Sequence, residues 1–134
     1  DTLVELFGNE KLLVLGSLPI WTEDLPKLIV KDYVQGNDFE GPSFNGLFDK
    51  KGDLDKMMRK DLEQRGVRFL SSMEAFCSAE GCMRTGLLES GETIATSYDS
   101  AHLSSAGSVI LSTHIVSSLE ALPLPQEELA SEEI

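Results

Sequence analysis

Apolar residues follow two different spacings along the chain, and their alternation predicts strands and helices in turn. The segment Lys11–Gly16 contains a short continuous apolar run, which is typical of a strand buried on both faces of a parallel sheet. Val67–Leu70, after a predicted helix that ends in glycine, is the next predicted strand. Apolar residues recur at helical spacing over 23–34, Asp53–Arg65 and Leu103–Leu122. Strands that alternate with amphipathic helices predict the α/β class.

Residues that favour helix ends mark the boundaries of these elements. Thr22 is expected to cap the first helix, Gly66 to end the second, and Pro123 to end the last. Glu92–Ser97 is expected to be extended, because it follows a turn that contains glycine. The buried side of the last helix is expected to consist of Val109, Ile110, Ile115, Val116 and Leu119.

Aromatic residues gather around a glycine-rich loop at residues 36–46. Phe39, Phe44 and Phe48 are expected to anchor this loop to the core, and the alternative is a lid that faces a substrate. Trp21 allows a similar choice between a core or rim position, which we favour, and a place at the edge of an active site.

Composition limits the kinds of partner. The chain has 134 residues, of which 41% are hydrophobic, and this suits one domain with a core. A net charge of −12 repels phosphate backbones, so nucleic-acid binding is not expected. Residues 126–134 form an acidic segment that we expect to be a flexible tail. The first residues resemble the last turns of a helix, which leads us to expect that the domain extends before Asp1.

The two cysteines, Cys77 and Cys82, lie in the segment FCSAEGC, where Gly81 allows a short loop to fold back. A disulfide, two free thiols and a metal site are all open, although a metal site needs two further ligands nearby. The acidic segment Asp49–Asp55 fails the pattern of a calcium loop, because Lys60 stands where a bidentate glutamate is required. The sequence predicts no cofactor and no metal.

Asp99 and His102 form a D-x-x-H pattern immediately before the last helix. A carboxylate that holds the Nδ1–H of an imidazole fixes its tautomer, so that the other ring nitrogen can accept a proton from a hydroxyl. Ser104 or Ser105 is expected to cap the following helix and hold this loop. The pattern alone also fits an aspartate that caps a turn beside a half-exposed histidine. His114, inside the helix, is interpreted as a partly exposed helix residue.

The segment YDSAHLSSAG resembles the last catalytic block, D-x-x-H-L-S-x-x-G, of the SGNH (GDSL-like) esterases and acyltransferases. LLVLGSLPIW and FCSAEGC are similar to segments of the SGNH domains that are fused to family-3 membrane O-acyltransferases. The resemblance implies that residues 1–125 are the C-terminal portion of a three-layer α/β/α fold with a mainly parallel sheet. It further implies a periplasmic or extracellular domain that transfers or hydrolyses O-acyl groups of glycans, with acetyl as the expected acyl group.

The resemblance also names partners: an acyl donor, a glycan hydroxyl as acceptor, the missing N-terminal half of the domain, and a membrane acyltransferase domain. In that family a G-D-S block supplies the nucleophilic serine, and this sequence contains no such block. The nucleophile is therefore expected from outside the chain. Ser17, which follows a predicted strand and a glycine, is the weaker alternative, because Pro19 disfavours the helix that would form an oxyanion hole. A non-catalytic glycan-binding module is the alternative function.

Overall fold

The computed structural model describes residues 2–121, so the predicted tail at 126–134 and the helix-ending Pro123 lie outside the described residues. None of the helices within that range combines the length and the apolar content needed to cross a membrane. The elements, in chain order, are α1 (Thr2–Phe7), η1 (Asn9–Lys11), β1 (Leu13–Leu15), α2 (Leu25–Gln35), α3 (Asp53–Gln64), β2 (Arg68–Leu70), α4 (Met73–Phe76), β3 (Cys77–Ser78), β4 (Gly81–Cys82), β5 (Thr85–Leu87), β6 (Thr93–Ala95) and α5 (Ser105–Glu120).

The strands form three separate two-stranded ladders. β1 and β2 are parallel, with Leu13 opposite Arg68 and Leu15 opposite Leu70. The other two ladders, β3–β4 and β5–β6, are antiparallel hairpins. The α/β class is confirmed, but residues 2–121 form one parallel ladder and two antiparallel ones, which differs from the expected mainly parallel sheet. The difference arises because each hairpin joins very short strands through a tight turn, and such strands leave little periodic signal in a sequence.

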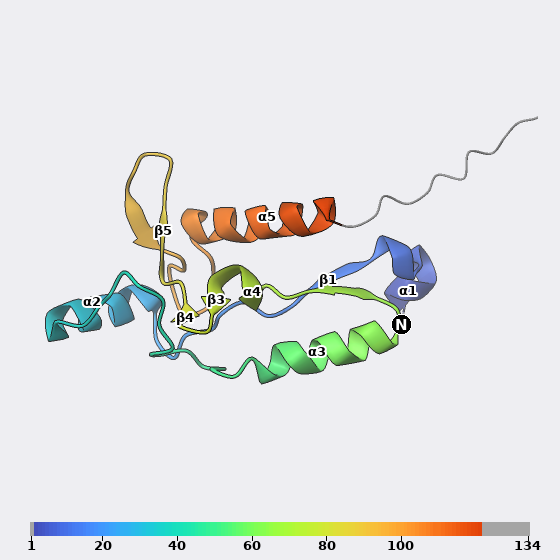
Figure 1. Ribbon diagram of the computed structural model, residues 1–134, viewed down its shortest axis with the longest axis horizontal. Helices are drawn as coiled ribbons and strands as arrows, with labels where there is room; N and C mark the ends of the chain where they lie inside the picture. Colours follow the sequence, from blue (N-terminus) through green and yellow to red (C-terminus); the bar gives the residue numbers. More distant parts are fainter. Residues whose placement is uncertain (1, 122–134) are drawn as a thin grey trace, which may run out of the picture.

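The parallel pair β1–β2 lies between two long helices, with α5 on one side and α3 on the other (Figure 1). α3 lies against β2, and the guanidinium of Arg59 sits over the ring of Phe69 at 5.2 Å from its centroid. Between α5 and the strands, however, there is a cavity of about 310 Å³, whose lining includes Leu13, Leu70 and Leu119. The helix on this side is therefore only partly packed on the strands.

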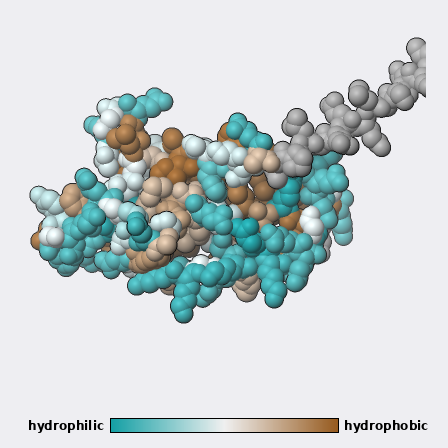
Figure 2. Space-filling model, in the orientation of Figure 1, coloured by the Kyte–Doolittle hydropathy of each residue, from teal (hydrophilic) through white to brown (hydrophobic). Residues whose placement is uncertain are grey.

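This loose packing explains a wrong expectation about α5. Val109, Val116 and Leu119 were expected to be buried but are 60%, 53% and 45% exposed, while Ile110 and Ile115 are half-buried. Only the first turn of the helix is buried, through Ala106 and Gly107 against β5 and β6. Hydrophobic side chains accordingly reach the surface around the β5–β6 hairpin and beneath α5, whereas the surface over α3 is hydrophilic (Figure 2).

The buried core cluster lies at the other end of the molecule, next to α2. It consists of Trp21, Leu25, Leu28, Leu47 and Cys82. Trp21 is 2% exposed, so the core interpretation of this residue is confirmed.

The aromatic residues of the loop do not anchor it as expected. Phe48 is 75% exposed and Phe44 is 37% exposed, so the expectation fails for these two. Phe39 is half-buried and packs edge-to-face on Tyr33, with 5.4 Å between the ring centroids. Leu47, which is fully surrounded, takes the anchoring role instead.

Cys77 and Cys82 form a disulfide across the β3–β4 hairpin. Of the disulfide, free thiols and metal site that the sequence left open, the disulfide is the one observed. Gly81 has a φ of 128°, and a Cβ at this position would lie 2.4 Å from the backbone carbon of Ser43. Ser43 in turn exchanges two backbone hydrogen bonds of 3.1 Å with Cys82. The disulfide hairpin therefore holds the glycine-rich loop in place.

Helix ends differ in detail from the sequence interpretation. Asp24, not Thr22, occupies the N-cap position of α2. Before α3, the carboxylate of Asp49 accepts hydrogen bonds of 3.2 Å from the backbone N–H groups of Asp53 and Leu54. These bonds lower the pKa of Asp49, and the bond from Leu54 contributes most. The segment that superficially suggested calcium binding thus serves as a helix-capping turn.

Candidate active site

The D-x-x-H pattern lies in a short loop that closes on itself between β6 and α5. Ser97 and Leu103 form an isolated antiparallel bridge at the base of the loop. Above it, the backbone N–H of Tyr98 donates to the carbonyl oxygen of His102 over 3.1 Å. Ser97 is 2% exposed, which means that the base of the loop is buried while its tip faces the solvent.

Asp99 and His102 are in direct contact within this loop. Asp99 Oδ2 and His102 Nδ1 are 2.7 Å apart. The other carboxylate oxygen, Oδ1, accepts hydrogen bonds from the backbone N–H groups of Ala101 at 2.8 Å and His102 at 2.7 Å. Because both oxygens are occupied, the carboxylate has a fixed orientation, and it holds the imidazole through Nδ1.

The same hydrogen bonds keep Asp99 ionised. The backbone N–H groups of Ala101 and His102 contribute most, and together with the His102 side chain they lower the pKa of Asp99 to about 2. An ionised carboxylate at Nδ1 favours the tautomer that carries its proton there, and it stabilises the imidazolium cation when the ring gains a second proton.

The imidazole of His102 is open to the solvent on the side away from Asp99. The His102 side chain is 71% exposed and that of Asp99 is 34% exposed. Tyr98 covers one face of the imidazole: the two rings are stacked with 5.7 Å between centroids and 14° between planes. Among the described residues no hydrogen bond to Nε2 of His102 is found, so this nitrogen is available to a hydroxyl from elsewhere.

Two hydrogen bonds attach the loop to residues 21–25, where the chain enters α2. The backbone N–H of Trp21 donates to the carbonyl oxygen of Ser100 over 2.8 Å, and that of Leu25 donates to the carbonyl oxygen of Asp99 over 3.1 Å. Trp21 and Leu25 both belong to the buried core, which therefore fixes the position of the Asp99–His102 loop.

On its other side the loop continues directly into α5. Ser104 is the N-cap residue: its hydroxyl accepts a hydrogen bond from the backbone N–H of Gly107 at 3.3 Å. The same hydroxyl donates to the carbonyl oxygen of Ala95 at the end of β6. Gly107 is needed for a close approach, because a Cβ there would lie 2.1 Å from the carbonyl oxygen of Thr96. Of the two serines proposed as the cap, Ser104 is the one observed.

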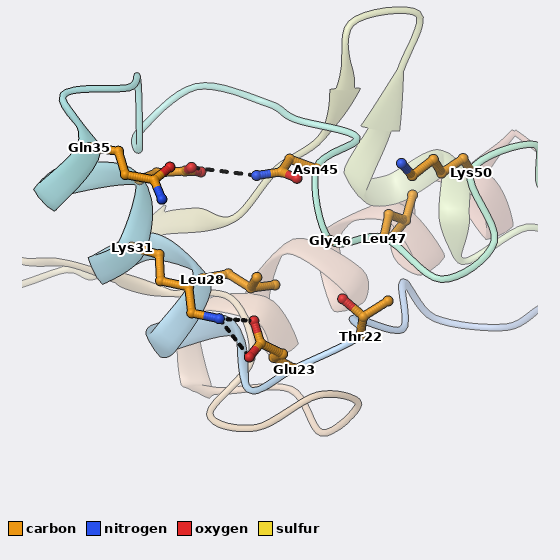
Figure 3. A pocket seen from close by; sticks show the side chains of 10 residues that line it. Thr22, Glu23, Leu28, Lys31, Gln35, Asn45, Gly46, Leu47 and Lys50 are labelled. Carbon is orange, nitrogen blue, oxygen red and sulfur yellow. Dashed lines mark hydrogen bonds and ion pairs between the residues drawn. The ribbon is translucent and has the colours of Figure 1, made fainter.

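A polar cavity of about 460 Å³ opens beside residues 22–23, between α2 and residues 45–50 (Figure 3). Its lining residues are Thr22, Glu23, Leu28, Lys31, Asp32, Gln35, Asn45, Gly46, Leu47 and Lys50. Neither Asp99 nor His102 lines this cavity.

A buried ion pair supports the wall of the cavity. Asp32 and Arg84 are 4% and 1% exposed, and the guanidinium of Arg84 is hydrogen-bonded to Asp32 and, over 2.8 Å, to the carbonyl oxygen of Asp38. The hydrogen bond from Arg84 is the largest cause of the lowered pKa of Asp32. The side-chain amide of Asn45 donates to Asp32 over 3.4 Å.

The sequence interpretation missed this ion pair, although one signal for it was present. Asp32 lies on the same helical face as Leu25 and Leu28, which are buried. A charged residue on a buried face requires a partner, and the partner could not be named because Arg84 is 52 positions away in the sequence.

The remaining candidates lie as follows. Ser17 is half-buried and comes just after β1, and the residues between it and α2 form no helix, so the structure provides no helical N-terminus next to its hydroxyl. His114 is partly buried on α5, and its Nε2 lies 3.0 Å from the carbonyl oxygen of Ser71. No cluster of three metal-ligating side chains occurs within residues 2–121.

Comparison with known proteins finds a similar fold in a solved structure. No family model matches the chain, and no curated protein matches it. The solved structure of the periplasmic domain of a lipopolysaccharide acetyltransferase from Salmonella ser. Paratyphi A is similar, with a TM-score of 0.69 and 22% sequence identity. The match covers 81% of this chain and 41% of that chain, so this chain spans about two fifths of the length of its structural neighbour. At this identity the chain shares a fold with the periplasmic acetyltransferase domain.

Proposed function

We propose that this chain supplies the Asp–His pair of an SGNH-type serine acyltransferase or esterase. The substrates would be O-acyl groups, most simply acetyl groups, on glycans outside the cytoplasm. The observation that carries the proposal is the contact of 2.7 Å between Asp99 Oδ2 and His102 Nδ1 beside an exposed imidazole. This is the arrangement by which a carboxylate prepares a histidine to act as a general base.

The chemistry assigned to these residues has two steps. In the first, Nε2 of His102 takes the proton of a serine hydroxyl while the serine oxygen attacks the carbonyl carbon of the acyl donor, and His102 then returns the proton to the leaving oxygen. In the second, a sugar hydroxyl or water attacks the acyl-serine, and His102 again removes and returns one proton. Asp99 stays ionised throughout and orients the ring.

The serine comes, in this proposal, from a segment other than residues 97–107. The absence of a G-D-S block from the 134 residues favours a segment outside the chain. Ser17 is the alternative within the chain, and the irregular backbone after it argues against an oxyanion hole of helical amides at that position.

Two observations support an extracytoplasmic glycan as the substrate. The structural neighbour is a periplasmic domain of a lipopolysaccharide acetyltransferase, which means that this fold occurs in an enzyme of that class. The Cys77–Cys82 disulfide fits an oxidising compartment such as the periplasm. A membrane acyltransferase domain is the partner that the proposal implies as the source of the acyl group.

The test is turnover of p-nitrophenyl acetate by the full-length gene product that contains this chain. His102→Ala is expected to lower kcat by about 10⁴-fold, and Asp99→Asn by a comparable factor, because each removes the oriented base. His114→Ala is the matched control, since that imidazole contacts the carbonyl of Ser71 and is assigned no chemistry. Turnover that is unchanged in His102→Ala would remove the pair from the mechanism. A loss as large in Ser17→Ala would instead identify Ser17 as the nucleophile.

A non-catalytic glycan-binding module is the second candidate, and one observation favours it. The 460 Å³ polar cavity is lined by residues other than Asp99 and His102, so a ligand could bind there without meeting the pair. Retained glycan binding in a protein with no esterase activity, in both the parent and His102→Ala, would favour this function over the enzyme.

A further inference from the structure

We propose that the cavity between α2 and residues 45–50 is a subsite for one or two uncharged sugar units of the acceptor glycan. Its volume of about 460 Å³ lies in the range of about 300–1,000 Å³ in which small-molecule sites are found. The role as an acceptor subsite rests on the proposed function, whereas the binding of a saccharide does not.

The hydrogen-bonding groups of the lining match a polyol. Asn45 uses its amide N–H to bind Asp32, which leaves its carbonyl oxygen as an acceptor. Gln35 accepts from Asn37 at 3.3 Å through its carbonyl oxygen, which leaves its amide N–H groups as donors. The hydroxyl of Thr22 can both donate and accept. Sugar hydroxyls also do both, so they can satisfy donors and acceptors within one cavity.

The charges of the lining are largely compensated, which favours an uncharged ligand. Lys31 pairs with Glu23, and the dashed lines between these two side chains in Figure 3 mark the contact. Asp32 pairs with Arg84 beneath the wall. Within residues 2–121, Lys50 is the charged lining residue that has no ion-pair partner. Its ammonium group can donate hydrogen bonds to a sugar hydroxyl as well as to an anion.

The wall of the cavity is a fixed frame. Leu28 and Leu47 line it and belong to the buried core cluster, so the lining is held by the core. The backbone N–H of Thr22 donates to the carbonyl oxygen of Gly46 over 2.7 Å, so the two sides of the cavity are tied together. A preformed site loses little conformational entropy when a ligand binds.

The cavity is connected to the Asp99–His102 loop through one short segment. Thr22 and Glu23 line the cavity, while Trp21 and Leu25 on either side of them bind the backbone of that loop. Thr22 and Leu25 are three positions apart, and three residues of chain span at most about 10 Å. The cavity and the Asp99–His102 loop are therefore attached to the same short segment, as adjacent subsites for one glycan require.

Binding can be measured without catalysis, by following the side-chain amide signals of Gln35 and Asn45 in NMR spectra of the full chain. Methyl α-D-galactopyranoside and methyl α-D-glucopyranoside are the neutral probes, glucuronate is the anionic probe, and glycerol controls for an unspecific polyol effect. We expect both amide groups to shift with a neutral glycoside and not with glycerol. Shifts confined to other parts of the chain, or none, would overturn the subsite.

Two variants at matched positions sharpen the measurement. Gln35→Ala is expected to weaken glycoside binding by about 3- to 10-fold, the loss of one or two hydrogen bonds. Gln64→Ala changes the same residue type at the last position of α3, outside the cavity, and is expected to leave binding unchanged. Equal effects in the two variants would contradict the proposal. Glucuronate binding at least 10-fold tighter than the neutral glycosides, and lost in Lys50→Gln, would overturn the assignment to an uncharged sugar.

The subsite and the proposed function can fail separately. Glycoside binding that persists in His102→Ala, in a protein without esterase activity, would sustain the subsite and refute the enzyme. Esterase activity that depends on His102, without any shift of the Gln35 and Asn45 amides, would sustain the enzyme and refute the subsite.

Discussion

The carboxylate of Asp99 makes its hydrogen bonds within a stretch of four residues. Its partners are the backbone N–H groups of Ala101 and His102 and the imidazole of His102. Such a local turn needs no distant element to form, and the lowered pKa of the carboxyl group is a direct consequence of it. The carboxylate therefore contributes both to the stability of the loop and to the orientation of the imidazole.

The stability contribution of Asp99 should depend on pH in a defined direction. Its pKa falls from 3.8 to about 2 on folding, so the contribution is fully present above pH 3.8 and is lost as the pH falls towards 2. We expect Asp99→Asn to be less stable than the parent at neutral pH and to approach it in acid. Urea denaturation across this range measures the difference, and a difference that stays constant down to pH 2 would contradict the assignment.

At the residue scale, local patterns were predictable and distant pairs were not. The contact of Asp99 with His102 follows from a spacing of three residues, and so does the cap at Ser104. Ser43 against Gly81 and Asp32 with Arg84 join parts of the chain that only the fold brings together. Nothing in the local sequence could assign these partners, although Asp32 on an apolar face indicated that one was needed.

Among the elements, α5 depends on how its first turn is attached. Ser104 caps the helix and also bonds to β6, while Ala106 and Gly107 are buried against the neighbouring strands. The later turns have exposed apolar side chains and a cavity beneath them. The first turn therefore determines how the helix is held next to the Asp99–His102 loop.

Removal of the cap should lower stability by a measurable amount. Ser104→Ala is expected to reduce the free energy of unfolding by about 1 kcal/mol, the usual cost of losing a serine N-cap. Ser105→Ala, one position further along and exposed, is the control and should change stability by less than about 0.5 kcal/mol. Chemical denaturation of both variants gives the comparison, and equal losses would show that the cap has no special role.

Helices were predicted more completely than strands. Their apolar spacing extends over 11 residues in α2 and 12 in α3, which is long enough to be recognised. The strands β3 and β4 have two residues each, and these are held by a disulfide and by contact with Ser43 rather than by an alternating pattern. The exposure of α5 was also unpredictable, because spacing shows which side is apolar and not what covers it.

Across the whole molecule, the Asp32–Arg84 pair joins α2, the glycine-rich loop and the segment before β5. Its charges are almost completely buried and paired with each other, with further hydrogen bonds to Asn37, Asn45 and the backbone of Asp38, while Nε of Arg84 has no hydrogen-bond partner among the described residues. A pair in this position costs desolvation, and it is most valuable in keeping three segments in one arrangement.

Breaking this pair should be far more damaging than replacing it. Asp32→Ala is expected to cost about 3–5 kcal/mol, because it leaves the guanidinium of Arg84 buried without its partner. The double variant with Asp32→Leu and Arg84→Met should recover part of this loss. The exposed pair of Asp24 and Lys27, 3.1 Å apart, is the control, and Lys27→Ala should cost at most about 1 kcal/mol. Urea denaturation would contradict the expectation if the double variant lost at least as much stability as Asp32→Ala.

The exposure of the His102 ring has a consequence for the outcome of the proposed reaction. The His102 side chain is 71% exposed among the described residues, so these residues alone shield little of it from bulk water. In the proposed reaction, hydrolysis of the acyl-serine by water then competes with transfer to a sugar hydroxyl. The ratio of the two depends on the surface that shields the imidazole, and not on the imidazole itself. Variants of that shielding surface, rather than of the base, are where a transferase would be converted into a hydrolase.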